Sequence, residues 1–255
     1  MVKVAGIQLY DGAIEQLVEE ILLQCTAEQQ NNYCISATGA HGIVEASKNP
    51  AFKKTLDAFY INMPDGMPTV WVGRIKGAKN MRRCYGPDFF KALLVASADL
   101  PIAHFFCGGK EGVAENLKLN CEARFGNSHV VGTYSPPFSE MTNEELTLLG
   151  ETINQSGAAI VWIGLSTPKQ EVFALRLAQF TRVKFFITVG AAFDFHTDRV
   201  KQAPRWVQMV GLEWFFRLLM EPKRLFSRYF EIVPYFIWLN IKEFVDFCAF
   251  KKSDI

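Results

Sequence analysis

Short β-rich runs alternate with amphipathic stretches from residue 1 to about residue 198, and no other feature limits the possible folds as much. Several runs are apolar at nearly every position, which is typical of strands that are covered on both faces of a parallel sheet. We expect strands at residues 2–9, 33–38, 58–63, 102–107, 129–133, 158–164 and 183–189. Their alternation with helical periodicity predicts the α/β class.

Helical periodicity occupies most of the segments between these runs. The first helix is expected at residues 11–24, with Asp11 as its N-cap. Further helices are expected at residues 87–98, 111–125, 142–155 and 168–180, and Pro168 suits the first position of the last one. The chain is therefore expected to fold as a Rossmann-like, mainly parallel sheet flanked by helices.

The composition changes after residue 200. Residues 206–250 contain thirteen aromatic side chains, and seven cations are concentrated nearby: Arg199, Lys201, Arg205, Arg217, Lys223, Arg224 and Arg228. We expect helices here, with breaks near Pro222 and Pro234. The sequence thus predicts an α/β core at 1–198 and a basic, aromatic-rich helical appendage at 199–255. Such a segment suits an anionic membrane surface, and the alternative is a helical lid packed on the sheet.

Charge and cysteine content exclude several classes of protein. The net charge of +1 gives no preference for nucleic acid. The six cysteines have no metal-binding spacing and are interpreted as reduced packing residues: Cys25, Cys34, Cys84, Cys107, Cys121 and Cys248. The first residues do not resemble a secretory signal, and no apolar run is long enough to span a membrane, so we expect a cytoplasmic location.

Ligands of parallel α/β sheets bind beyond the carboxyl ends of the strands, so the loops after the strands are the candidate sites. Gly108, Gly109 and Lys110 follow one strand and precede a helix, a setting that suits a diphosphate group. The sequence is neither a Walker A motif nor a complete GxGxxG motif, and a tight turn between strand and helix is the alternative. No cofactor is expected.

Other loops after strands carry polar side chains. Asp65 follows a strand and could accept a proton from a hydroxyl group, or it could simply form an Asp-Gly turn. Lys169 and Gln170 begin a helix that faces the same region, and Asp194 could bind a nucleobase or ribose or close its loop. The four histidines have no metal-ligand spacing. Asp-x-Asp is absent from the sequence, so we expect cations and backbone N–H groups, and no metal, to stabilise a leaving group.

Six sequence blocks, in this order, resemble the WecG/TagA/CpsF family of bacterial glycosyltransferases. The blocks span residues 38 to about 230: PDGMPTVW, RRCYGPD, FCGGKEGVAENL with VVGTYSPPF, GLSTPKQE, GAAFDFHTDRVKQAPRW and GLEWFFRLLMEPKRLFSRY. The resemblance implies transfer of N-acetylmannosamine, its uronic acid or a related hexose from a UDP-sugar donor to a polyprenyl-diphosphate-linked saccharide acceptor. It further implies inversion at the sugar, no essential metal and a peripheral position on the inner face of the cell membrane.

The resemblance also implies roles for individual residues. Asp65 would be the general base, Thr38 and Arg83 would line the active site, and Gln170 would contact the donor. The appendage would close over the site and meet the membrane or the acceptor's diphosphate with Arg217, Arg224 and Arg228. Thr38-Gly39-Ala40-His41 and Pro68 depart from the common family pattern, so glucose, glucuronic acid or another hexose remains an alternative donor sugar.

Two other function classes stay open at this point. An enzyme that modifies a UDP-sugar, such as an epimerase, would use the same nucleotide pocket without needing an acceptor. A non-catalytic assembly protein would dock on the membrane and tolerate substitution of Asp65 and Gln170. The apolar surface of the appendage is also compatible with an interface between subunits of a homo-oligomer.

Overall fold

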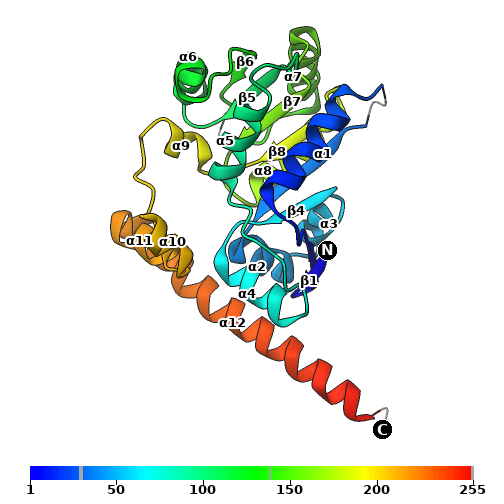
Figure 1. The fold of residues 1–255 in the computed structure, drawn as a ribbon, viewed down its shortest axis with the longest axis vertical. Coiled ribbons are helices and arrows are strands. Elements are labelled where there is room, and N and C mark those ends of the chain that lie inside the picture. The colour runs from blue at the N-terminus through cyan, green and yellow to red at the C-terminus, as the bar shows by residue number, and fades with distance from the viewer. Residues whose placement is uncertain (29–30, 138, 254–255) are drawn as a thin grey trace.

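A six-stranded, all-parallel sheet forms the centre of the protein, as seen in a computed structural model that describes residues 1–28, 31–137 and 139–253, with side chains described up to residue 246 (Figure 1). The strand order is β4-β3-β8-β7-β5-β6. The bounds are β3 Tyr33–Thr38, β4 Ile61–Pro64, β5 His104–Gly108, β6 Val130–Tyr134, β7 Ile160–Gly164 and β8 Phe185–Thr188. The predicted α/β class and parallel sheet are confirmed.

Helices cover both faces of this sheet. One face packs against α1 (Ile14–Thr26), α5 (Gly86–Ala96), α6 (Val113–Phe125) and α9 (Ala192–His196), and the other against α7 (Asn143–Ser156) and α8 (Lys169–Ala178). Trp162 in β7 is fully buried and packs edge-on against Phe90 of α5. Burial on both faces explains why the central strands are apolar at almost every position.

A third apolar cluster lies beside the sheet and joins the two ends of the chain. It contains residues of β1 (Val2–Val4), β2 (Ile7–Leu9), α2 (Ala40–Lys48), α3 (Pro50–Asp57) and α4 (Met67–Ile75). Ile232 and Phe236 belong to the same cluster, although they come from α12 (Pro222–Ser253). Part of the predicted appendage therefore packs into the core formed by the N-terminal segments.

Two short helices precede α12 and lie to one side of the sheet: α10 (Arg205–Met209) and α11 (Glu213–Met220). The sequence of α11 is largely apolar, yet none of its residues is buried. Figure 1 shows α12 as a long helix that passes α2 and α4 and extends beyond the rest of the molecule. In the described part of the chain, no helix is long and apolar enough to cross a bilayer.

Several predicted boundaries are wrong, each for a local reason. Residues 2–9 form an antiparallel hairpin, not one strand, because Ala5 and Gly6 adopt positive φ angles and reverse the chain. Ala13, not Asp11, is the N-cap of α1, and Asp11 instead pairs with the N-terminal amino group. Pro168 is the N-cap of α8 and not its first residue.

The predicted break near Pro222 is confirmed, whereas the predicted break at Pro234 is wrong. Pro222 begins α12 directly after α11 ends, but α12 continues through Pro234. Proline removes one backbone hydrogen bond, to the carbonyl four residues earlier. That residue is Phe230, which is exposed, so water can satisfy the carbonyl.

The cysteine interpretation holds for the described side chains. Cys34, Cys84, Cys107 and Cys121 are buried free thiols, and Cys25 is a partly buried one. Burial raises the pKa of the Cys34 thiol to about 12, which keeps it protonated and unreactive. The side chain of Cys248 lies outside the described residues. The domain boundary at residue 198 stays a prediction.

Candidate active site

The carboxyl ends of all six strands open into a single large cavity. The strands are parallel and in register, with Thr38 beside Pro64 and Gly108 beside Gly164, so their following loops meet at one edge of the sheet. The cavity has a volume of about 1730 Å³. One lining residue from the loop after each strand, in order from β3 to β8, is Gly39, Asp65, Gly109, Ser135, Leu165 and Val189. Residues of α11 and α12 complete the opposite wall.

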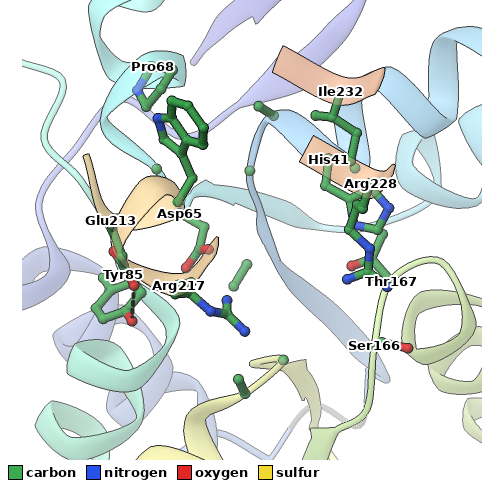
Figure 2. Close-up of a pocket in the computed structure, with 18 of the residues that line it drawn as sticks. His41, Asp65, Pro68, Tyr85, Ser166, Thr167, Glu213, Arg217, Arg228 and Ile232 are labelled. Atoms are coloured by element: carbon green, nitrogen blue, oxygen red, sulfur yellow. Dashed lines mark hydrogen bonds between the residues drawn. The ribbon is translucent and has the colours of Figure 1, made fainter. Parts of the chain in front are cut away.

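Asp65 lies at the end of β4, one residue before the N-cap of α4, and its side chain points into the cavity (Figure 2). Its Oδ1 accepts a hydrogen bond from the backbone N–H of Gly86 at 2.8 Å. Burial raises the pKa of this carboxyl group to about 6, against the opposing effects of the Arg83 charge and the Gly86 N–H group. A carboxyl group with such a pKa can hold and release a proton near neutral pH.

Arg83 fastens the appendage to the loop that carries Asp65. Its Nε donates to the main-chain carbonyl of Asp65 at 2.7 Å, and its Nη1 donates to Oε1 of Gln208 at 3.0 Å. The guanidinium also forms an ion pair with Glu213 of α11 and stacks on the ring of Tyr85 at 3.8 Å. The Tyr85 hydroxyl donates to the same Glu213 carboxylate (Figure 2). Arg83 thus acts on the backbone of Asp65, whereas the sequence predicted only that it lines the site.

Two appendage arginines face the cavity from opposite sides. Figure 2 shows Arg217 beside Asp65, while Arg228 lies across the cavity next to His41. Among the described residues, the buried Nε of Arg217 has no hydrogen-bond partner. Burial and the nearby Arg228 charge lower the pKa of His41 to about 4, so this histidine is neutral at physiological pH. The cavity therefore contains guanidinium charge that an anionic ligand can neutralise.

Arg224 also lines the cavity, but its charge is shared. Its Nε and Nη2 atoms both contact the carboxylate of Glu221 at 2.7 Å, one turn earlier. More than half of its side chain is exposed. Arg224 consequently lies nearer the surface than Arg217.

The glycine loop after β5 is shaped by contacts inside the sheet. Gly108 has a φ of 141°, and a Cβ atom there would come within 2.6 Å of the Gly164 backbone. The N–H of Gly109 donates to the Gly164 carbonyl at 2.8 Å, so it is already used. Gly108 does not line the cavity, whereas Gly109 and the exposed Lys110 do. The predicted diphosphate contact therefore depends more on Lys110 than on the N–H of Gly109.

Gln170 joins the loops that follow β7 and β8. Its Oε1 accepts from the backbone N–H of Gly190 at 3.1 Å, and its Nε2 donates to Oε1 of Glu171 at 2.8 Å. Glu171 is buried, and its Oε2 lacks a hydrogen-bond partner within the described part of the chain. Burial raises the pKa of the Glu171 carboxyl. Gln170 lines the cavity and fixes its shape; the predicted donor contact stays a prediction.

Thr38 and Asp194 occupy different levels of the site. Thr38 is buried beneath the cavity lining, where its hydroxyl lies 2.8 Å from that of Ser36 and 3.5 Å from Oδ1 of Asn62. Asp194 lines the cavity, and its carboxylate lies 3.8 Å from the Nε of Arg199. Thr38 can therefore support the floor, and Asp194 can contact a ligand directly.

The structure brings most of the predicted residues together at this cavity. Those lining it are Asp65, Arg83, Gly109, Lys110, Gln170, Asp194, Arg217, Arg224 and Arg228. Sequence reasoning gave no role to Tyr85, Glu171 or Glu213. Glu213 carried a usable signal, since it is an acidic residue in a strongly basic segment and needs a cationic partner. No three histidine, cysteine, aspartate or glutamate side chains gather as metal ligands among the residues described.

Comparison with known protein families agrees with this geometry. The model of the glycosyl transferase WecG/TagA/CpsF family matches residues 2–247. The chain belongs to this family. The match covers nearly the whole chain, including the described parts of α11 and α12 that line the cavity. Membership in the WecG/TagA/CpsF family makes the chain a glycosyltransferase of polysaccharide biosynthesis, which favours transfer over the epimerase and assembly-protein alternatives.

Proposed function

We propose that the protein transfers a hexose from a UDP-sugar to a polyprenyl-diphosphate-linked saccharide, with inversion at the anomeric carbon. N-acetylmannosamine, its uronic acid or a related hexose is the proposed sugar. The observation that carries this proposal is the pairing of one carboxyl group, Asp65, with the unpaired guanidinium of Arg217 in the same cavity. A base for the acceptor and a cation for the leaving diphosphate are the two groups that the reaction needs.

In the proposed mechanism, Asp65 removes the proton from the acceptor hydroxyl as its oxygen attacks the anomeric carbon. A bond forms from that oxygen to the sugar while the bond from the sugar to UDP breaks on the opposite face. Arg217, Arg228 and Lys110 stabilise the negative charge on the departing UDP. These cations supply the charge that a metal would otherwise provide, so we propose that transfer is metal-independent.

The surface of α10 and α11 supports a peripheral position on the inner face of the cell membrane. Trp206, Met209 and Leu219 are each about two-thirds exposed or more. Arg205 and Lys223 are exposed nearby in the sequence. Exposed apolar side chains next to cations suit the interface of a membrane with anionic lipids.

The test is to incubate the purified protein with a panel of UDP-sugars and a polyprenyl-diphosphate-linked monosaccharide in the presence of EDTA. UDP release and the mass of the lipid product are followed together. A product heavier by one hexose identifies the donor and supports metal-independent transfer. Conversion of the UDP-sugar without acceptor, or no reaction and no UDP binding by calorimetry, would contradict the proposal.

A further inference from the structure

One face of α12 changes from cationic to apolar along its length. Cavity-lining residues recur about every four positions, starting with Arg224 and Arg228 and continuing with Ile232, Phe236, Asn240 and Phe244. Residues four apart lie above one another on a helix, so this is a single stripe. From Arg228 to Phe244 the stripe is roughly 24 Å long at 1.5 Å per residue.

A second apolar stripe faces the cavity from α4. Met67, Trp71 and Ile75 line the same cavity at four-residue intervals, and Asp65 lies just before this helix. The ring of Trp71 packs closely on Gly211, where an added Cβ atom would come within 2.5 Å of it. The stripe on α4 therefore begins at the proposed catalytic carboxylate and leads away from it.

Polar contacts hold the two helices on either side of a groove. Lys48 of α2 pairs with Glu231 of α12, and Lys76, directly after α4, pairs with Glu243 of α12. The backbone N–H of Ala5 also donates to Glu243 at 2.9 Å. Ile232 and Phe236 form the buried base of the α12 stripe. The α12 side of the groove is thus anchored to the core at two points along its length.

The outer part of the groove stays exposed in the protein alone. Ile75 is 74% exposed, and Ile237 and Ile241, which also line the cavity, are 54% and 58% exposed. Apolar surface of this kind, continuous with a binding cavity, is a mark of a ligand or partner site. The occupant must have an anionic part near Arg217 and Arg228 and an apolar part near Ile75 and Ile241.

We infer that the groove between α4 and α12 holds the first isoprene units of the acceptor's polyprenyl chain. The inference rests on the proposed function, because the acceptor is the one substrate that joins a diphosphate to a long hydrocarbon. The acceptor's saccharide lies at Asp65, its diphosphate near the appendage arginines and its chain along the apolar stripes. The enzyme therefore recognises the lipid chain itself as well as the head group.

The experiment compares two pairs of substitutions on the same helix. Ile237→Ser with Ile241→Ser removes apolar side chains from the groove. Phe226→Ser with Phe230→Ser is the control, since these exposed side chains do not line the cavity. Transfer is measured with the same saccharide on undecaprenyl diphosphate and on geranyl diphosphate, in detergent and without vesicles.

We expect kcat/KM for the undecaprenyl acceptor to fall about tenfold or more in the groove variant, because the chain loses buried apolar contact. The geranyl acceptor and the KM for the donor should change little, and the control should behave as the wild type. An equal loss in both variants would mean that α12 acts only by adhering to lipid. An unchanged undecaprenyl preference in the groove variant, or a change of oligomeric state in it, would also overturn the inference.

A binding measurement separates this inference from the proposed function. Full-length protein is irradiated with a farnesyl diphosphate analogue that carries a benzophenone at the end of its chain, and the adducts are mapped by mass spectrometry. Adducts near Ile75 or Ile241 that excess undecaprenyl diphosphate removes support the groove, even when no donor sugar gives transfer. Adducts confined to the face of Phe226 and Phe230 overturn it, even when transfer occurs.

Discussion

Replacing one atom of the Asp65 side chain is the most direct test at the scale of single residues. Asp65→Asn keeps an oxygen that can accept from the Gly86 N–H but removes the basic carboxylate. General-base catalysis contributes about 10²- to 10⁴-fold, so transfer should fall by that factor, or about 3 to 5 kcal/mol of barrier. UDP binding by calorimetry should be retained. Normal turnover in a folded variant would rule out Asp65 as the base.

The raised pKa of Asp65 predicts how activity depends on pH. The base must be ionised, so kcat/KM should fall about tenfold for each pH unit below a pKa of about 6. Stability runs the other way: the folded protein binds this proton more tightly than the unfolded chain, whose pKa is about 3.8, so the contribution of Asp65 decreases as pH rises through this window. A pH–rate profile with its acid limb near pH 4 would contradict the assignment.

Local motifs revealed the residues of the site but not their partners. Asp65, Lys110 and Gln170 could be selected because each lies in a loop that follows a strand. The bond from Arg83 to the Asp65 carbonyl, and the contact of both Arg83 and Tyr85 with Glu213, depend on residues up to 130 positions apart meeting in space. Sequence periodicity does not specify contacts between distant loops.

At the scale of elements, Glu213 determines where α11 lies. It binds Arg83 and Tyr85 of the core and precedes Arg217 by one helical turn. Glu213→Gln should lower transfer about tenfold to a hundredfold, because a hydrogen bond to a charged group contributes about 1.5 to 3 kcal/mol. The Glu213 charge also raises the pKa of Asp65, so the acid limb should move to lower pH.

The control for this prediction is Glu231→Gln, which removes an exposed ion pair with Lys48. Exposed pairs contribute little, so this variant should keep both its rate and its acid limb. If Glu213→Gln lowered the rate without moving the limb, its effect would be a general loss of structure. Circular dichroism and the midpoint of thermal unfolding would show such a loss directly.

The elements themselves were predictable where burial is uniform. Strands β5, β7 and β8 coincide with predicted runs to within two residues because both faces of each strand are covered. Helices α2, α3 and α4 were missed because the first and third begin at glycine- and proline-containing loops that were interpreted only as binding sites. α12 continues through Pro234 because only one exposed carbonyl loses its partner.

At the scale of the whole molecule, the third apolar cluster couples the two ends of the chain. Truncation after Gln202 removes Ile232 and Phe236, each of which contributes roughly 1.5 to 3 kcal/mol by burial. We expect the remaining α/β core to fold and bind UDP, but with a lower midpoint of thermal unfolding and almost no transfer. Full activity in the truncated protein would exclude a catalytic part for the appendage.

The exposed apolar side chains of α10 and α11 predict how the whole protein meets a membrane. Trp206→Ser with Met209→Ser should weaken binding to vesicles that contain anionic lipid, because both side chains are at least 69% exposed and would otherwise enter the interface. Neither residue lines the cavity, so transfer to a short-chain acceptor in detergent should be unchanged. Co-sedimentation should also show that high salt weakens binding of the wild type, since Arg205 and Lys223 attract the anionic surface. Asp65→Asn is the matched control, since it should bind vesicles normally and fail to transfer. Equal vesicle binding by the double variant and the wild type would mean that α10 faces water or another subunit.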